Sequence, residues 1–197
     1  MGKIYCLMGK SSTGKDSIYQ QLFQREELKI KKIIPYTTRP MRQGEVQGRE
    51  YIFCDEDTVE RLNRENKIVE LRCYDTVQGL WKYFTVDDGQ IDLSKNSYLM
   101  VGTLETYLGI RNYFGKEKVC PIYIYVEDGE RLIRAIGRER LQPVPQYEEM
   151  CRRFLADAKD FSEEKLREAE ITTMFENQNL EETIEQVASY MKETMKQ

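Results

Sequence analysis

Short apolar runs alternate along the chain with longer segments in which apolar residues recur at helical spacing. The run Ile4–Met8 fits a buried strand, whereas residues 16–24 carry apolar side chains at Ile18, Leu22 and Phe23, as one face of a helix does. Such alternation is typical of βα units. It predicts an α/β fold built around a largely parallel sheet.

The same pattern places the remaining elements. Strands are also predicted at residues 30–34, 51–54, 68–73, 81–86, 98–101, 119–126 and 171–175. Further helices are predicted at residues 56–65, 104–114, 129–140, 146–168 and 180–195. The strands between residues 51 and 86 are short and crowded, which predicts a small antiparallel subdomain. Prolines in Leu141-Gln-Pro-Val-Pro145 interrupt helical structure, so we expect a hinged excursion there.

Composition limits the possible functions. A chain of 197 residues is long enough for one domain, and its net charge of −4 disfavours DNA or RNA as a main partner. The N-terminus does not resemble a signal peptide and no run approaches the ~20 apolar residues of a membrane span, so a soluble cytoplasmic protein is expected. There is no histidine, which excludes Ser-His or Cys-His catalysis and histidine-ligated zinc. The five cysteines are scattered and are expected to stay reduced and to pack as small apolar residues.

A phosphate-binding loop is predicted between the first strand and the first helix. The segment Gly9-Lys-Ser-Ser-Thr-Gly-Lys15 fits the pattern G-x-x-x-x-G-K in the required strand and helix context, which argues against a glycine turn that binds nothing. Its backbone N–H groups and the helix N-terminus would point at phosphate oxygens, with Lys15 at the β and γ positions. The expected ATP-binding residues here are Gly9, Ser11, Ser12, Thr13, Gly14, Lys15, Asp16 and Ser17.

Asp16 departs from the usual pattern of this loop. It stands where a serine or threonine ordinarily holds magnesium, and a hydroxyl follows one place later at Ser17. Two interpretations remain open. Asp16 is either an acid in the first helical turn, which the helix dipole favours, or a hard oxygen ligand that reaches Mg²⁺ directly or through water.

A second anion-binding loop follows the second predicted strand, in Tyr36-Thr-Thr-Arg-Pro-Met-Arg-Gln-Gly-Glu-Val-Gln-Gly-Arg-Glu-Tyr51. Here the chain closely resembles guanylate kinases, whose signature is T-T-R-x-x-R-x-G-E-x-x-G-x-x-Y. The matching residues are Thr37, Thr38, Arg39, Arg42, Gly44, Glu45, Gly48 and Tyr51. Two arginines and a tyrosine hydroxyl on a glycine-bent loop can surround a phosphate. With the first loop, the chain has the two phosphate sites that a phosphoryl transferase requires.

The resemblance implies how an acceptor nucleotide would bind. Glu70 looks like the family's carboxylate that accepts from the ring N–H and amino group of guanine, a donor pair that adenine lacks. The hydroxyl of Thr85 would meet the base. The residues implied for the acceptor phosphate are Arg39, Arg42, Tyr51 and Tyr83. The segment 74–80 is longer than in the family, and an ordinary strand aromatic is the alternative for Tyr83.

Two departures bear on the acceptor. Pro35 stands where guanylate kinases usually carry a base-contacting serine, and it can supply neither a hydroxyl nor a backbone donor. Gly102 stands where the family carries an aspartate that helps bind nucleotide and metal. The loss of that aspartate could lower activity, or Asp16 could compensate for it.

Arginines near the proline-containing excursion resemble the lid arginines of the family. Arg134 in Leu132-Ile-Arg-Ala-Ile-Gly-Arg138 would stack on adenine, and Arg138 with Arg153 would close over the transferred phosphoryl group. Asn177 matches the family's adenine-contacting asparagine. Salt-bridged residues on exposed helices are the structural alternative for these arginines. The catalytic residues implied are Lys15, Arg138 and Arg153.

Together these features imply a P-loop three-layer α/β sandwich with a mostly parallel sheet, an inserted nucleotide-binding subdomain and a helical lid. The expected single domain, 1–197, divides into a core (1–34, 87–137 and 151–197), a GMP-binding subdomain (35–86) and a lid (138–150). The implied reaction moves the γ-phosphoryl group of ATP, with Mg²⁺, to GMP or dGMP. The expected partners are small nucleotides, with no nucleic acid or membrane, and the protein would act as a monomer or homodimer.

Two other functions stay open. The acceptor could be a different nucleotide, as Pro35 and Gly102 allow. Alternatively, the chain could be a non-catalytic module, like the guanylate-kinase-like domains of scaffolding proteins that recognise phosphopeptides. Those domains usually have a degraded P-loop, whereas Gly14 and Lys15 are intact here, which favours an enzyme.

Overall fold

A parallel five-stranded sheet forms the centre of the protein. The computed structural model describes residues 2–76 and 79–196, and its central strands follow the order β2-β7-β1-β8-β9. Their bounds are β1 Ile4–Met8, β2 Ile30–Lys32, β7 Ser97–Val101, β8 Val119–Tyr125 and β9 Met174–Glu176. Every neighbouring pair is parallel, with Ile4 of β1 paired to Tyr98 on one side and Val119 on the other. The predicted α/β class with a largely parallel sheet is confirmed.

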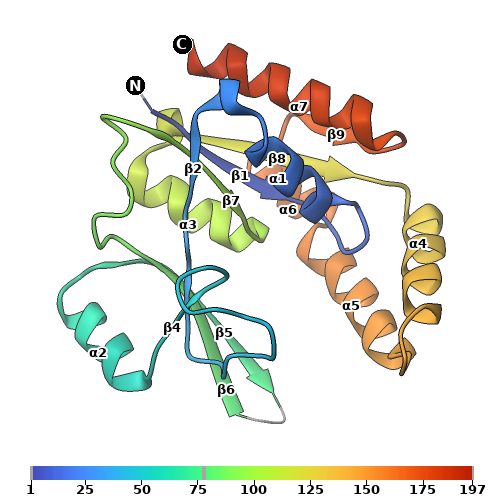
Figure 1. Cartoon of the computed structure of the whole chain (residues 1–197), viewed down its shortest axis with the longest axis horizontal. Coiled ribbons are helices and arrows are strands. Elements are labelled where there is room, and N and C mark those ends of the chain that lie inside the picture. Colours follow the sequence, from blue (N-terminus) through green and yellow to red (C-terminus); the bar gives the residue numbers. More distant parts are fainter. Residues whose placement is uncertain (1, 77–78, 197) are drawn as a thin grey trace.

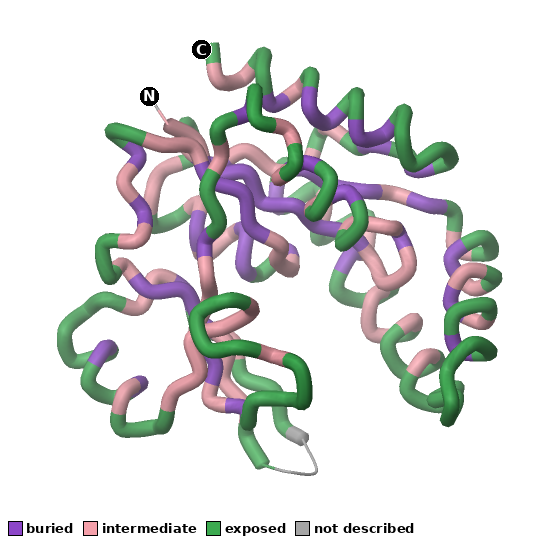
Figure 2. The backbone as a smooth tube through the Cα atoms, in the orientation of Figure 1, coloured by how far each residue is buried: buried purple, intermediate pink, exposed green. Residues whose placement is uncertain are grey.

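Helices cover both faces of this sheet, because side chains along β1 alternate between two buried clusters. Ile4, Cys6 and Met8 join the cluster under α3 (Leu104–Phe114), whereas Tyr5 and Leu7 join the cluster under the other two helices. Those helices are α1 (Lys15–Phe23) and α7 (Leu180–Met195). Two short 3-10 turns, Glu26–Leu28 and Lys116–Lys118, complete the connections. The result is a three-layer sandwich whose buried strands lie at the centre of the molecule (Figures 1 and 2).

A second, smaller sheet is inserted between β2 and β7. It has the order β4-β3-β6-β5, with β3 Tyr36–Thr37, β4 Ile52–Phe53, β5 Ile68–Thr76 and β6 Gly79–Val86. Helix α2 (Glu56–Arg64) packs its buried Val59 and Leu62 against Phe84 and Val86 of β6. The predicted antiparallel subdomain is therefore present, but β3 and β4 pair in parallel and β3 was not expected as a strand. The long connection predicted at 74–80 lies partly outside the described residues.

The segment between β8 and β9 is helical and projects from the sheet (Figure 1). Helix α4 (Asp128–Arg140) leads through the predicted proline excursion into α5 (Tyr147–Asp160), and α6 (Glu163–Glu168) follows. The prediction of one helix over 146–168 was wrong at its end. Phe161 is buried in the central core and the Ser162 hydroxyl caps the N-terminus of α6, so the chain turns between the two helices. In Figure 1, α4 and α5 lie on one side of the molecule and the small sheet on the other.

The cysteines agree only in part with what the sequence predicted. All five cysteines are free, as expected, but Cys73 and Cys151 are exposed rather than packed inside. None of the helices between residues 2 and 196, leaving out 77 and 78, is long and apolar enough to cross a bilayer.

Candidate active site

The phosphate loop joins the end of β1 to α1, and two glycines give it its shape. A Cβ atom on Gly9 would lie 2.6 Å from the carbonyl oxygen of Ile124, so a side chain there would collide with β8. Gly14 has φ 82°, and a Cβ there would lie 2.6 Å from Nδ2 of Asn177. Only glycine fits both the limited space and the positive φ at position 14. Its missing side chain lets the loop lie close to the neighbouring chain segments. The loop leads directly into the N-terminus of α1 at Lys15.

The predicted adenine-side residues lie together beside this loop. The Asn177 side chain is buried and its Nδ2 donates to the Thr13 carbonyl oxygen at 2.8 Å. Arg134 donates to the Asn177 carbonyl oxygen at 3.1 Å, and both residues line a hollow with Val126 and Gln178. The amide of Asn177 thus supports the loop from behind, while Arg134 borders the hollow.

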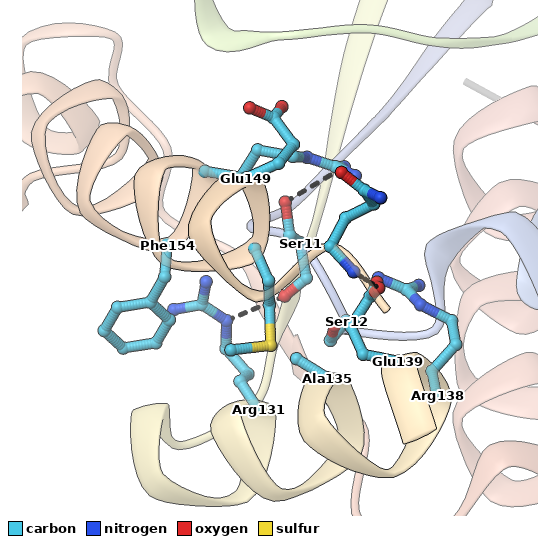
Figure 3. Close-up of a pocket in the computed structure, with 11 residues that line it drawn as sticks. Ser11, Ser12, Arg131, Ala135, Arg138, Glu139, Glu149 and Phe154 are labelled. Carbon is cyan, nitrogen blue, oxygen red and sulfur yellow. Dashed lines mark hydrogen bonds between the residues drawn. The ribbon is translucent and has the colours of Figure 1, made fainter. Parts of the chain in front are cut away.

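The three predicted catalytic cations converge on the phosphate loop. Burial lowers the pKa of Lys15, the charges of Asp16 and Asp157 act in the opposite direction, and Arg153 and Arg138 lower it further. Arg138 and Arg153 line one pocket with Ser11 and Ser12, and Arg153 donates to the Ser11 hydroxyl at 3.2 Å (Figure 3). Both arginines are exposed. The site therefore gathers three positive charges where an anion would be bound.

A pair that the sequence did not indicate connects helices α4 and α5 to the loop. Arg131 of α4 is 1% exposed, donates from Nε to the Ser11 carbonyl oxygen at 2.9 Å and pairs with the carboxylates of Asp128 and Asp157. The same Asp157 oxygen accepts from the backbone N–H of Ser11 at 2.6 Å. A carboxylate thus occupies one amide of the loop that was predicted to bind phosphate. Nothing in the sequence pattern indicated this, because Arg131 and Asp157 belong to different helices.

Possible magnesium ligands near the loop are few. Asp16 and Ser17 are exposed in the first turn of α1, and Asp16 lines a cavity together with Pro35, Tyr51 and Val101. A Cβ at Gly102 would lie 2.9 Å from Thr106, whose hydroxyl accepts from the backbone N–H of Thr103 at the N-terminus of α3, so the missing aspartate has no room there. Within residues 2–76 and 79–196, no three acidic or cysteine side chains form a metal-binding cluster.

The second loop forms a compact basic site on the small sheet. Arg39 is 4% exposed and forms a bidentate pair with Glu45, at 2.5 and 2.7 Å, while its guanidinium lies 5.1 Å from the Tyr51 ring centroid. The bond from Arg39 lowers the pKa of Glu45 to about 2, and the backbone N–H of Arg42 contributes to the shift. The hydroxyl groups of Thr37 and Thr38 bond the backbone of Lys82 instead of facing solvent. The Arg42 side chain is exposed.

Three tyrosines and Glu70 continue this site along the sheet. Tyr83 packs edge-on against Tyr51 at 5.7 Å and against Tyr74 at 5.5 Å between ring centroids. Glu70 is 8% exposed and accepts from the Thr85 hydroxyl at 2.8 Å. Because residues two apart on a strand share a face, the structure brings Glu70, Thr85 and Tyr83 together as the resemblance implied.

Arg72 is a further member of this face that the sequence analysis missed. Its Nε donates to Glu70 at 2.9 Å, with only 12% and 4% of the two side chains exposed. Burial alone would lower the pKa of Arg72, but the charge of Glu70, and then Tyr74, leaves that pKa above its usual value. The period-two pattern of β5 could have indicated Arg72, since it places residue 72 on the same face as residue 70.

Known proteins that resemble this chain match it over the segments that form these sites. The family model "Guanylate kinase" matches residues 1–78, which include the phosphate loop, the second loop and Glu70. Guanylate kinase of Bacillus subtilis is 38% identical over 69 residues, 35% of this chain and 34% of that protein. Over residues 1–78 the chain is similar to the guanylate kinase family.

Similarity to the family extends beyond the first third at lower identity. Guanylate kinase of Rhodopirellula baltica is 28% identical over 143 residues, 70% of this chain and 67% of that protein. The crystal structure of guanylate kinase from Anaplasma phagocytophilum aligns with a TM-score of 0.63 and 23% identity, over 97% of this chain and 85% of that one. The B. subtilis match spans about a third of that relative's length, so sequence identity is concentrated in the N-terminal region.

Proposed function

We propose that the protein is a nucleoside monophosphate kinase that transfers the γ-phosphoryl group of ATP to GMP or dGMP, giving ADP and GDP or dGDP. One observation carries the proposal: two basic sites occur in one chain, one on the phosphate loop and one on the small sheet beside Glu70 and Thr85. A phosphoryl transferase must hold two phosphorylated substrates at once. Asp16 beside the loop and Tyr51 of the second site line the same cavity, which supports their facing a common space.

The residues suggest how the transfer would be catalysed. Lys15 and the loop amides would hold the donor phosphates, and Arg138 with Arg153 would neutralise charge on the group in flight. The acceptor phosphate would lie against Arg39, Arg42, Tyr51 and Tyr83, with its base against Glu70 and Thr85. Closure of the lid over 138–150 would exclude water, so that the acceptor phosphate attacks in its place.

Magnesium is part of this proposal. Mg²⁺ in such sites is held by one or two carboxylates together with substrate phosphates, and the exposed carboxylate of Asp16 next to Lys15 fits that requirement. When bound, the ion would offset negative charge on the substrate phosphates. The proposed setting is the cytoplasm, where ATP and GMP are available.

A coupled assay of ADP production tests the proposal directly. The protein is given ATP and Mg²⁺ with GMP, dGMP, AMP, CMP or UMP in turn, and ADP is measured. We expect turnover confined to GMP and dGMP, because Glu70 needs the paired donors of guanine. Turnover with another nucleotide would keep the kinase and reject the guanine assignment. No turnover by folded protein that binds nucleotide would instead indicate a binding module.

A further inference from the structure

Arg39, the central arginine of the acceptor site, is already heavily engaged. Both of its terminal amino groups are bound to the Glu45 carboxylate, and one of them also donates to the Pro40 carbonyl oxygen at 2.9 Å. Its guanidinium is packed against the rings of Tyr51 and Phe53 at 5.1 and 5.3 Å from their centroids. The side chain of Arg42 is exposed on the loop. An anion bound only by Arg39 and Arg42 would therefore contact one cation that is buried and already paired and one cation that is solvated.

Arg72 places a third arginine at the same site. It lies directly across from Tyr83 in the antiparallel pair of β5 and β6, so the two side chains are neighbours on one face. Tyr83 in turn contacts both Tyr51 and Tyr74. The arginines at positions 39 and 72 both act on the Tyr51 hydroxyl, where each lowers its pKa against the larger effect of burial. The charges of both guanidinium groups thus act on Tyr51, and Tyr83 packs against Tyr51.

The orientation of Arg72 gives it two separate tasks. Its Nε is bound to the carboxylate of Glu70, which is the base-recognition end of the site. The Arg72 side chain also interacts with Tyr74, which is two residues further along β5 and packs against Tyr83 at the phosphate end of the site. Arginine suits this position because its planar fork can bind two oxygen groups in fixed directions.

We infer that Arg72 is an additional acceptor-binding residue, whose terminal amino groups bind the phosphate of the nucleoside monophosphate while its Nε holds Glu70 toward the base. This inference rests on the proposed function, since it concerns the same acceptor site. It links base recognition to phosphate binding through one side chain. A nucleoside that lacks the phosphate forgoes the contact with the terminal amino groups but keeps the oriented Glu70.

The test compares binding of GMP with binding of guanosine, measured by calorimetry in wild-type protein and in Arg72→Gln. The ratio of the guanosine Kd to the GMP Kd reports the contribution of the phosphate alone. We expect Arg72→Gln to lower this ratio about tenfold or more, the effect of losing a charge-assisted bond, with Arg72→Lys recovering part of it as a point charge. Arg61→Gln is the control, because Arg61 is exposed on α2 and pairs only locally with Glu65.

Folding could affect the result, because removing Arg72 leaves the buried Glu70 carboxylate unpaired. The double variant Glu70→Gln with Arg72→Gln avoids that, and its ratio is compared with that of Glu70→Gln alone. An equal loss of affinity for GMP and guanosine would overturn the inference, since Arg72 would then act on the base only. The inference would also be overturned if the ratio of the guanosine Kd to the GMP Kd stayed at the wild-type value in Arg72→Gln and at the Glu70→Gln value in the double variant. If wild-type protein binds GMP no better than AMP, the proposed function itself fails, which distinguishes the two failures.

Discussion

At the scale of single residues, most of the site depends on paired charges rather than on isolated groups. Arg39, Arg72 and Arg131 are each nearly buried, and each has at least one carboxylate partner. Burying a charge without such a partner is costly, so each pair fixes the direction of its guanidinium. Substrate anions would be met by cations that are already oriented.

The pair of Arg39 and Glu45 predicts a specific acid response. Because Arg39 lowers the pKa of Glu45 to about 2, below the usual value near 4.3, its ionisation stabilises the fold fully above about pH 4.3. That contribution is lost as the pH falls toward 2. We expect Glu45→Gln to be less stable than wild type at pH 7, with the difference in urea midpoint shrinking between pH 4.3 and 2. A difference that stays constant with pH would contradict this.

At the scale of elements, the approach of α3 to β5 positions Glu70. A Cβ on Gly109 of α3 would lie 2.4 Å from the Cβ of Glu70, closer than side chains ever approach. A glycine in a helix interior ordinarily costs stability, so its presence here follows from this contact. The helix thus packs directly behind Glu70, the carboxylate proposed to bind the base.

The variant Gly109→Ala tests whether the contact with α3 positions Glu70. Alanine favours the helix by about 1 kcal/mol, but the overlap with Glu70 should cost roughly 1–3 kcal/mol and displace the carboxylate. We expect no gain in stability by urea unfolding and a severalfold higher KM for GMP. Gly137→Ala in α4 is the matched control, because nothing lies within 4 Å of its added Cβ, and it should be stabilised by about 0.5–1 kcal/mol. If Gly109→Ala were more stable than wild type and kept a normal KM for GMP, α3 would be able to move away from Glu70 without cost.

At the scale of the whole molecule, the phosphate loop connects three separate parts of the chain. Asn177 supports it from the residue directly after β9, Arg131 from α4 and Asp157 from α5. The carboxylate of Asp157 bonds one loop amide and lies near Lys15, where a bound phosphate would bring further negative charge. Nucleotide binding and lid position are therefore expected to depend on each other.

Asp157→Asn separates these effects. Removing the charge should strengthen ATP binding severalfold, because repulsion of the phosphates is relieved. It should also lower the free energy of unfolding by about 1–3 kcal/mol, since Arg131 loses one of its two carboxylate partners. Calorimetry with ATP and urea unfolding measure the two quantities. Asp160→Asn on the same helix, with a carboxylate 3.8 Å from Lys165, should change neither appreciably, and weaker ATP binding by Asp157→Asn would refute the repulsion argument.

The sequence by itself determined those features that depend on neighbours along the chain. Hydrophobic period and glycine spacing fixed β1, α1, α3, α7 and the phosphate loop, because strand and helix faces repeat every two and 3.6 residues. The motif in 36–51 indicated the second loop for the same local reason. Tertiary structure decided what depends on distant contacts: the break at Phe161, the pair of Arg131 and Asp157, and the salt bridge of Arg72 with Glu70. These charges interact strongly because segments remote in the sequence bury them, and no local pattern encodes which segments will meet.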